Sequence, residues 1–169
     1  MKKRMMVALF SVVLVFIACI SAQAQVPKEG TVSGVRAFST TSIKTVAMGK
    51  ERVMFIYEAT GVHIGDSSDS ILHNSSFRGV GSTTIVNGTL EDSGFCVNIR
   101  PDGDQIFTTY KSIGVMATGI KRTWTFVGGT GKFVGIEGGG ENEAPLGIRP
   151  AAEGSMQGYN RMTGHYKLP

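Results

Sequence analysis

Short segments in which apolar and polar residues alternate dominate the chain after residue 24. A period of two residues indicates strands that face a core on one side, and no stretch of ten or more residues has the i, i+3, i+4, i+7 spacing of an amphipathic helix. The segments that fit this pattern are 31–38, 52–64, 77–86, 95–100, 105–111, 122–127, 132–137 and 156–167. About eight short strands at close intervals predict an all-β fold, either a sandwich or a single closed antiparallel barrel, and we favour the barrel because closure removes exposed edges.

Glycine-containing turns separate these segments. All 23 glycines lie after residue 24 and are dispersed among β-branched and aromatic residues, as expected for short strands joined by tight turns and bends. The clearest turn signals are Asn87-Gly88, Pro101-Asp102-Gly103-Asp104 and Gly128-Gly129-Thr130-Gly131. Segments 66–74 and 141–153 are predicted loops. The two aspartates of the second turn, Asp102 and Asp104, resemble a catalytic pair in the sequence. In a hairpin, however, they are expected to accept hydrogen bonds from turn amides.

The first 24 residues have the pattern of a signal peptide. Three basic residues at 2–4 precede an apolar run at 7–20, and Ala22-Gln23-Ala24 supplies the small-x-small cleavage pattern. We expect cleavage after Ala24 and a periplasmic or secreted product in which residues 25–169 form one β-barrel domain. A lipoprotein anchored through Cys19 is the alternative.

The charge balance changes once these residues are removed. The whole chain has 17 basic and 13 acidic residues, a net charge of +4, and the first 24 residues hold three basic and no acidic residues. The remaining 14 basic and 13 acidic residues give +1, and without a basic block we predict no nucleic-acid partner. The early apolar run is too short for a convincing membrane span, so no transmembrane segment is expected in the mature chain. Only Cys96 then remains, which excludes an intramolecular disulfide.

One part of the chain resembles a known family. The segment Trp124-Thr125-Phe126-Val127-Gly128-Gly129-Thr130-Gly131-Lys132-Phe133, followed by Gly135 and Gly138, is similar to a strand, glycine turn and strand of the allene oxide cyclase and dirigent barrel group. The upstream strand Gly94-Phe95-Cys96-Val97-Asn98-Ile99 and the hairpin after it fit the same group. The resemblance covers the chain from about Gly94 to Gly140. It implies an eight-stranded barrel with an apolar, calycin-like interior, often in dimers or trimers.

The same resemblance implies a role for Cys96. In the plant cyclases a cysteine of the matching strand lies in the barrel cavity and is thought to assist the reaction with a glutamate from the first strand. Here region 30–45 contains no acidic residue, so half of that pair is missing. The alternative interpretation is a buried, unreactive cysteine, a common fate of free thiols.

Strand parity identifies further candidate residues around Cys96. Asn98 and Arg100 share its face of the strand, and the apolar residues between them share the other. If Cys96 faces the lumen, Asn98 and Arg100 are candidate ligand-binding residues, together with Tyr110 and Trp124 from later strands. The pattern does not decide which face is the inner one, and Trp124 is most simply a core residue.

Other kinds of site have weak support in the sequence. His63, His73 and His165 lack the spacing of a metal site, and we predict no metal and no cofactor. The glycine turn at 128–131 is not followed by a helix or a Lys-Ser/Thr pair, so we interpret it as structural and not as a nucleotide loop. No Gly-x-Ser-x-Gly elbow is present for a serine nucleophile.

Three functions remain open at this point. The first is a non-enzymatic exported barrel that binds a small apolar or amphipathic ligand. The second is a cyclase-like or dirigent-like enzyme that steers a reactive apolar intermediate, mainly by restraining its shape. The third is an eight-stranded outer-membrane barrel, which needs an apolar lipid-facing band and aromatic girdles. Whether the chain is an enzyme is left undecided, with the non-enzymatic interpretation favoured.

Overall fold

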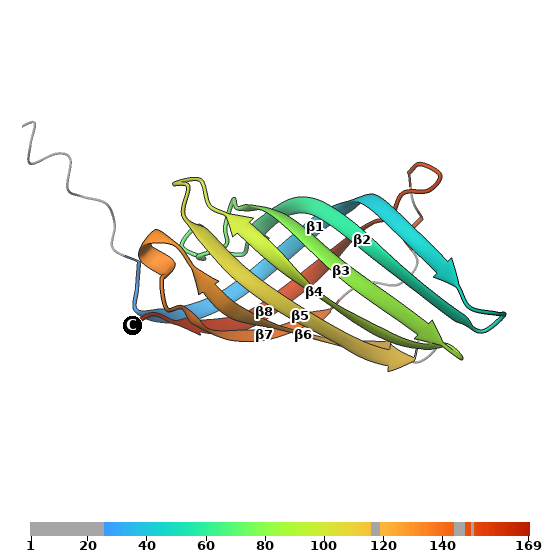
Figure 1. Cartoon of the computed structure of the whole chain (residues 1–169). Coiled ribbons are helices and arrows are strands. Elements are labelled where there is room, and N and C mark those ends of the chain that lie inside the picture. Colours follow the sequence, from blue (N-terminus) through green and yellow to red (C-terminus); the bar gives the residue numbers. More distant parts are fainter. Residues whose placement is uncertain (1–25, 116–118, 144–147, 150) are drawn as a thin grey trace, which may run out of the picture.

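The computed structural model describes residues 26–115, 119–143, 148–149 and 151–169; at residues 119 and 120 it describes the backbone alone. The predicted signal peptide, including Cys19, lies outside the described residues. Within them the chain forms eight antiparallel strands that close into one barrel in the order β1 to β8, each paired with its neighbours in sequence and β8 with β1. Figure 1 shows the strands winding around a common axis. The predicted all-β single barrel is confirmed.

The strand bounds agree with the predicted segments to within one residue at each end for β2, β3 and β8, whereas β1 continues to Ala47, well beyond its predicted end at residue 38. They are β1 (Glu29–Ala47), β2 (Arg52–Gly65), β3 (Ser76–Val86), β4 (Thr89–Ile99), β5 (Gln105–Val115), β6 (Gly119–Gly129), β7 (Glu137–Glu143) and β8 (Gln157–Lys167). The predicted turn at Asn87-Gly88 joins β3 to β4, and both residues have the positive φ that a tight turn of this kind requires, 50° and 77°.

The structure corrects the prediction after the glycine turn. Segment 132–137, predicted as a strand, instead forms a short 3-10 helix, η1 (Gly131–Phe133), and a further turn in which Gly135 has a φ of 77°. The segment resembled a strand because it contains the apolar residues Phe133, Val134 and Ile136, but the two buried ones, Phe133 and Ile136, are three positions apart, which does not match the period of a strand. The actual seventh strand, β7, overlaps the start of the predicted loop 141–153.

β7 gave no strand signal because its centre is Gly138-Gly139-Gly140. The structure explains the glycines by close backbone approach: a side-chain carbon at Gly139 would collide with the carbonyl oxygen of Trp124, and one at Gly140 with that of Thr163. Side chains at these positions would therefore push β7 away from β6 and β8. Close approach of neighbouring backbones is one of the recognised reasons for glycine inside a strand.

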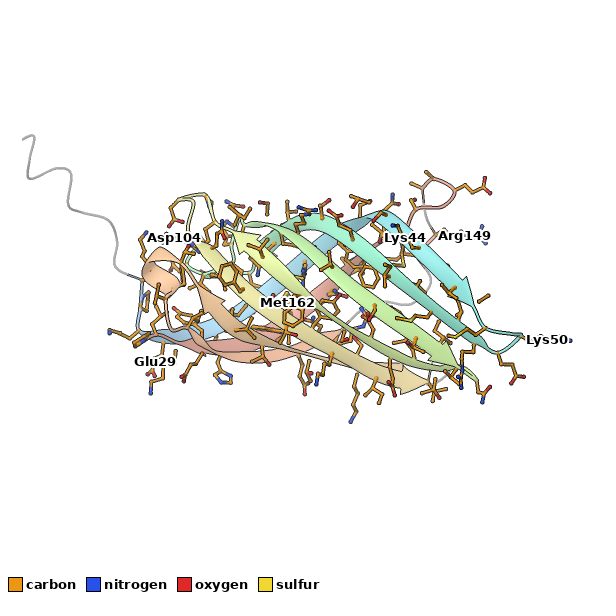
Figure 2. All side chains as sticks on the ribbon, viewed as in Figure 1. Glu29, Lys44, Lys50, Asp104, Arg149 and Met162 are labelled. Atoms are coloured by element: carbon orange, nitrogen blue, oxygen red, sulfur yellow. The ribbon has the colours of Figure 1, made fainter. Side chains whose placement is uncertain are left out.

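One end of the barrel is filled by an apolar core, and we call it the closed end. The loop between β2 and β3 contributes Ile71 and Leu72, η1 contributes Phe133, and the strands contribute inward-facing side chains. The core cluster consists of Val32, Ile71, Leu72, Ile106, Trp124, Phe126, Phe133, Ile136, Met162, Tyr166 and Leu168. Figure 2 labels Met162 inside the barrel, with Glu29 and Asp104 at the closed end and Lys44, Lys50 and Arg149 at the other.

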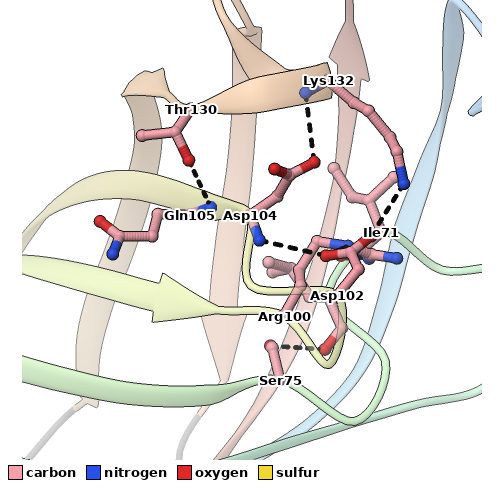
Figure 3. Close-up of polar contacts among 9 residues, drawn as sticks. Ile71, Ser75, Arg100, Asp102, Asp104, Gln105, Thr130 and Lys132 are labelled. Carbon is pink, nitrogen blue, oxygen red and sulfur yellow. Dashed lines mark hydrogen bonds and ion pairs between the residues drawn. The ribbon is translucent and has the colours of Figure 1, made fainter.

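Polar contacts tie the closed-end loops together (Figure 3). The Asp104 N–H donates to Asp102 at 3.2 Å, Asp104 accepts from the Lys132 N–H at 3.2 Å, and the Lys132 ammonium lies 3.0 Å from Asp102. The predicted role of the two aspartates as acceptors for turn amides is confirmed. Arg100, which follows β4, donates to the Ile71 carbonyl and lies 5.2 Å from the centroid of the Phe133 ring.

The opposite end, which we call the open end, carries the β1–β2 and β3–β4 turns. β1 pairs with β8 only as far as Ser39, whereas its pairing with β2 continues to Ala47, so this hairpin extends beyond the β8 wall. Residues 41–50 are all exposed. Among the described residues, no helix has the length and apolar character needed to cross a membrane. The apolar core cluster lies toward the closed end.

Candidate functional site

The barrel interior is hollow on the open side of the core. The cavity has a volume of about 170 Å³ and is partly open to solvent. Each of the eight strands contributes at least one residue to its wall, and β8 contributes Asn160. The lining residues are Arg36, Phe38, Phe55, Tyr57, Ala59, Phe77, Gly79, Thr83, Leu90, Asp92, Cys96, Tyr110, Ser112, Arg122, Asn142, Met156 and Asn160. The wall thus combines apolar and aromatic side chains with polar ones.

Five of the polar residues form a continuous row across five strands of the wall. Thr83, Asp92, Ser112, Arg122 and Asn142 are direct register partners on five successive strands, β3 to β7. Because partners in adjacent strands lie on the same face of a sheet, all five side chains point into the same cavity. We call these five residues the polar belt.

A tyrosine pair lies against the belt. The Tyr57 hydroxyl donates to Asp92 at 2.8 Å and lies 2.6 Å from the Tyr110 hydroxyl, so Tyr110 donates to Tyr57. Glycines make room for the two rings: a side-chain carbon at Gly81 or Gly94 would collide with the Tyr110 hydroxyl. These glycines are themselves register partners on β3 and β4.

Burial favours the neutral forms of Tyr57, Tyr110 and Asp92. Burial raises the pKa of Asp92, against the hydrogen bonds from Tyr57 and Thr83 and the charge of Arg122, which lower it. Burial also raises the pKa of both Tyr57 and Tyr110, so their hydroxyls stay protonated and available as hydrogen-bond donors. The cluster can donate and accept hydrogen bonds without carrying the charge of an ionised phenol.

Arg36 occupies the opposite wall of the cavity. Its guanidinium donates to the Cys96 sulfur at 2.8 Å and lies 3.7 Å above the centroid of the Phe77 ring. Both Arg36 and Cys96 are buried, with 7% and 6% of their surfaces exposed. Within the part of the chain that the structure describes, Arg36 has no carboxylate within ion-pair distance, since the ion pairs there are all formed by other basic residues.

A hydrogen-bonded layer separates the cavity from the core. Asn98 donates to the Ile106 carbonyl at 2.8 Å and to Thr108 at 3.3 Å, which leaves its side-chain oxygen to accept from His63 Nε2 at 2.9 Å. Burial, together with the charge of Arg36, lowers the pKa of His63 to about 3, so this imidazole is neutral at physiological pH. Asn98 is 1% exposed, so it braces the barrel beneath the cavity.

The structure separates the five residues predicted from the sequence. Cys96 and Tyr110 line the cavity, and the parity question is answered because Cys96 faces inward. Asn98 lies in the layer beneath it. Trp124 belongs to the core, where its ring packs 5.0 Å from Phe126 in an edge-to-face arrangement. Arg100 lies at the closed end, away from the lining.

Most of the polar lining was not predicted from the sequence; the unpredicted residues include Arg36, Tyr57, Asp92, Arg122 and Asn142. One signal was available for Asp92: it lies two alternations before Cys96 and therefore shares its face, but the predicted strand began only at residue 95. The others required the register between strands. Parity within one strand cannot show which residues of different strands meet.

Neither a metal site nor a known relative identifies the cavity. Among the described residues, no group of three or more histidine, cysteine, aspartate or glutamate side chains is arranged to hold a metal ion. Comparisons with protein-family models, with curated proteins and with solved structures found no match to this chain.

Proposed function

We propose that this chain is an exported β-barrel protein that binds a small amphipathic molecule in the cavity at its open end. The observation that carries the proposal is the division of the interior: one half of the barrel is filled with side chains, and the other half is hollow. Ligand pockets are typically concave and largely apolar with a few placed polar groups, as here. Phe38, Phe55, Leu90 and Met156 supply the apolar part, and the polar belt supplies the anchors.

The outer surface supports this proposal over a lipid-facing barrel. Exposed apolar residues such as Val80 and Phe95 occur on β3 and β4, but outward positions of β7 and β8 carry Glu141, Glu143 and Arg161. A barrel in a bilayer needs an apolar band on all sides, because charged residues facing the lipid are destabilising. We therefore propose a location outside the membrane, which is the location that the predicted export implies.

A plugged variant tests whether the cavity binds the ligand. The cavity is similar in volume to engineered cavities that bind benzene, so it holds about one ring. The substitution Ala59→Phe places a ring in that space. Protein purified after export should release a small molecule on solvent extraction and enhance the fluorescence of the neutral probe 2-naphthol. Ala59→Phe should lose both signals.

The matched control is Val80→Phe, which adds a ring on the outer face of the next strand, where Val80 is 54% exposed. It should keep both signals. If Ala59→Phe folds and binds 2-naphthol as the unmodified protein does, the ligand does not occupy the cavity and the proposal fails.

A second candidate function is an enzyme of the kind that the resemblance to allene oxide cyclases implies. The observation that favours it is the position of the Cys96 sulfur, inside the cavity and in contact with Arg36. The first strand supplies an arginine here where the resemblance implies a glutamate, so the chemistry would differ from that of the cyclases. Turnover of an unsaturated epoxide by the unmodified protein, lost in Cys96→Ala, would favour the enzyme; equal activity of both would remove the thiol from the reaction.

A further inference from the structure

The cavity holds more positive than negative side chains. Arg36 and Arg122 are its two cations, and Asp92 is the one carboxylate among its lining residues. Asp92 already accepts hydrogen bonds from Tyr57 at 2.8 Å and Thr83 at 3.0 Å. Neither arginine forms an ion pair with it or with any other described carboxylate.

An unpaired cation inside a protein is costly. Removal from water costs several kcal/mol per ion after relaxation, and buried charges are normally paired. The sulfur and the aromatic ring beside Arg36 are weak substitutes for a carboxylate. An anionic group on the ligand would supply the missing partner.

The two arginines line the same cavity from different strands. Arg36 is the register partner of Asn160 on β8, and Arg122 donates to the Asn160 side-chain oxygen at 3.1 Å. The Arg122 guanidinium therefore lies beside Asn160, whereas the Arg36 guanidinium reaches Cys96 and Phe77. A carboxylate that enters the cavity suits both groups, because guanidinium groups bind carboxylates through paired hydrogen bonds.

Asn142 gives an independent sign of a missing ligand. Its side chain is 8% exposed and lines the cavity, yet its oxygen has no hydrogen-bond partner among the described residues. Buried amides are almost always satisfied. Asn142 is the register partner of Arg122, so the unsatisfied amide lies next to the proposed anion site, where turning the amide presents its N–H group.

The volume limits the rest of the ligand. A cavity of about 170 Å³ is close to engineered cavities that hold a benzene molecule, so about one ring fits inside. The side chains toward the mouth include Phe38 and Phe55, which offer aromatic faces to such a ring.

We propose, on the basis of the function proposed above, that the natural ligand is a monocarboxylic acid with a single aromatic ring. Arg36 and Arg122 bind its carboxylate, Asn142 donates a further hydrogen bond, and the ring lies toward Phe38 and Phe55.

A matched pair of probes tests this assignment by calorimetric titration. 3-Phenylpropanoate and 3-phenylpropan-1-ol share the ring and chain and differ in the charged group. The acid should bind the exported protein at least about tenfold more tightly than the alcohol, since charge-assisted hydrogen bonds are roughly twice as strong as neutral ones. Equal affinities would overturn the carboxylate assignment and leave the proposed cavity function intact. If neither probe binds, the result counts against the carboxylate assignment and against the cavity function.

Arginine variants locate the effect. Arg122→Met should reduce the affinity for the acid to that for the alcohol and should leave the affinity for the alcohol unchanged. We expect the same result for Arg36→Met. Binding of the alcohol reports that each variant is folded; if Arg36→Met does not fold, Arg122→Met decides alone. Arg161→Met is the control, because Arg161 is exposed on the outer face and paired with Asp66. An advantage of the acid that survives Arg122→Met would refute the proposal.

Discussion

His63 gives the barrel a specific sensitivity to acid. Burial first, and the charge of Arg36 second, lower the pKa of His63 from its ordinary value of 6.5 to about 3, while the hydrogen bond to Asn98 opposes the shift. In the unfolded chain the imidazole binds a proton below about pH 6.5, whereas in the folded barrel it stays neutral. The unfolded state therefore binds more protons in this range, and the free energy of unfolding decreases as the pH falls from 6.5 toward 3.

The size of the effect follows from the shift. Each pH unit between the two values removes about 1.4 kcal/mol, so His63 alone accounts for about 2.7 kcal/mol between pH 6.5 and about pH 4.5. Asp92 acts in the opposite direction, because its raised pKa means that the folded state binds a proton more readily than the unfolded chain. The contribution of His63 must therefore be measured against a variant that keeps Asp92.

His63→Gln is that variant. Glutamine does not titrate, and its side-chain N–H can still donate to Asn98, although it loses the packing of the imidazole 5.5 Å from the Phe77 ring. We expect the variant to be less stable near neutral pH by about 1 kcal/mol and to become the more stable protein below about pH 5.5. Urea unfolding across this pH range measures both curves, and His165→Gln, at an exposed position, should follow the unmodified protein. Parallel curves for the unmodified protein and His63→Gln would refute the reasoning.

Three further changes probe the interior. Gly94→Ala should destabilise the barrel by about 1–3 kcal/mol in urea unfolding, because the added carbon collides with the Tyr110 hydroxyl. Phe133→Ala removes a fully buried ring from the closed end and should cost about 3–5 kcal/mol, whereas Val134→Ala, exposed beside it, should cost less than about 0.5 kcal/mol; similar losses would mean that the ring does not plug the barrel. Cys96 is buried and should react slowly with iodoacetamide, with the reaction monitored by mass spectrometry. Bound 3-phenylpropanoate should slow this reaction further, and an unchanged rate would place the bound acid away from the sulfur.

The barrel was predictable because most strands carry a local signal. Segment 52–64 is rich in β-branched and aromatic residues and became β2 almost unchanged, and Asn87-Gly88, whose residues tolerate positive φ, marked the turn between β3 and β4. Strand β4 was predicted to begin six residues too late, because Glu91, Asp92 and Ser93 have low strand propensity. Asp92 is stabilised there by hydrogen bonds from β2 and β3, and such tertiary contacts leave no local pattern.

The cavity was less predictable than the fold. Sequence parity grouped Cys96 with Asn98 but could not show that one faces the cavity and the other supports it from below. That difference depends on depth along the barrel axis, which the register between strands sets. Arg36 likewise lies sixty positions from Cys96, and only closure of β1 against β8 and β2 brings the two side chains together.

The central claim is that a ligand occupies the open half of the barrel and leaves the closed half unchanged. Methyl-labelled protein, titrated with 3-phenylpropanoate and followed by NMR, tests it directly. We expect chemical-shift changes at Met156 and Leu90, which line the cavity, with little change at Met162 and Leu72 in the core. Shifts confined to outward residues such as Ile113, or spread evenly through the core, would contradict it.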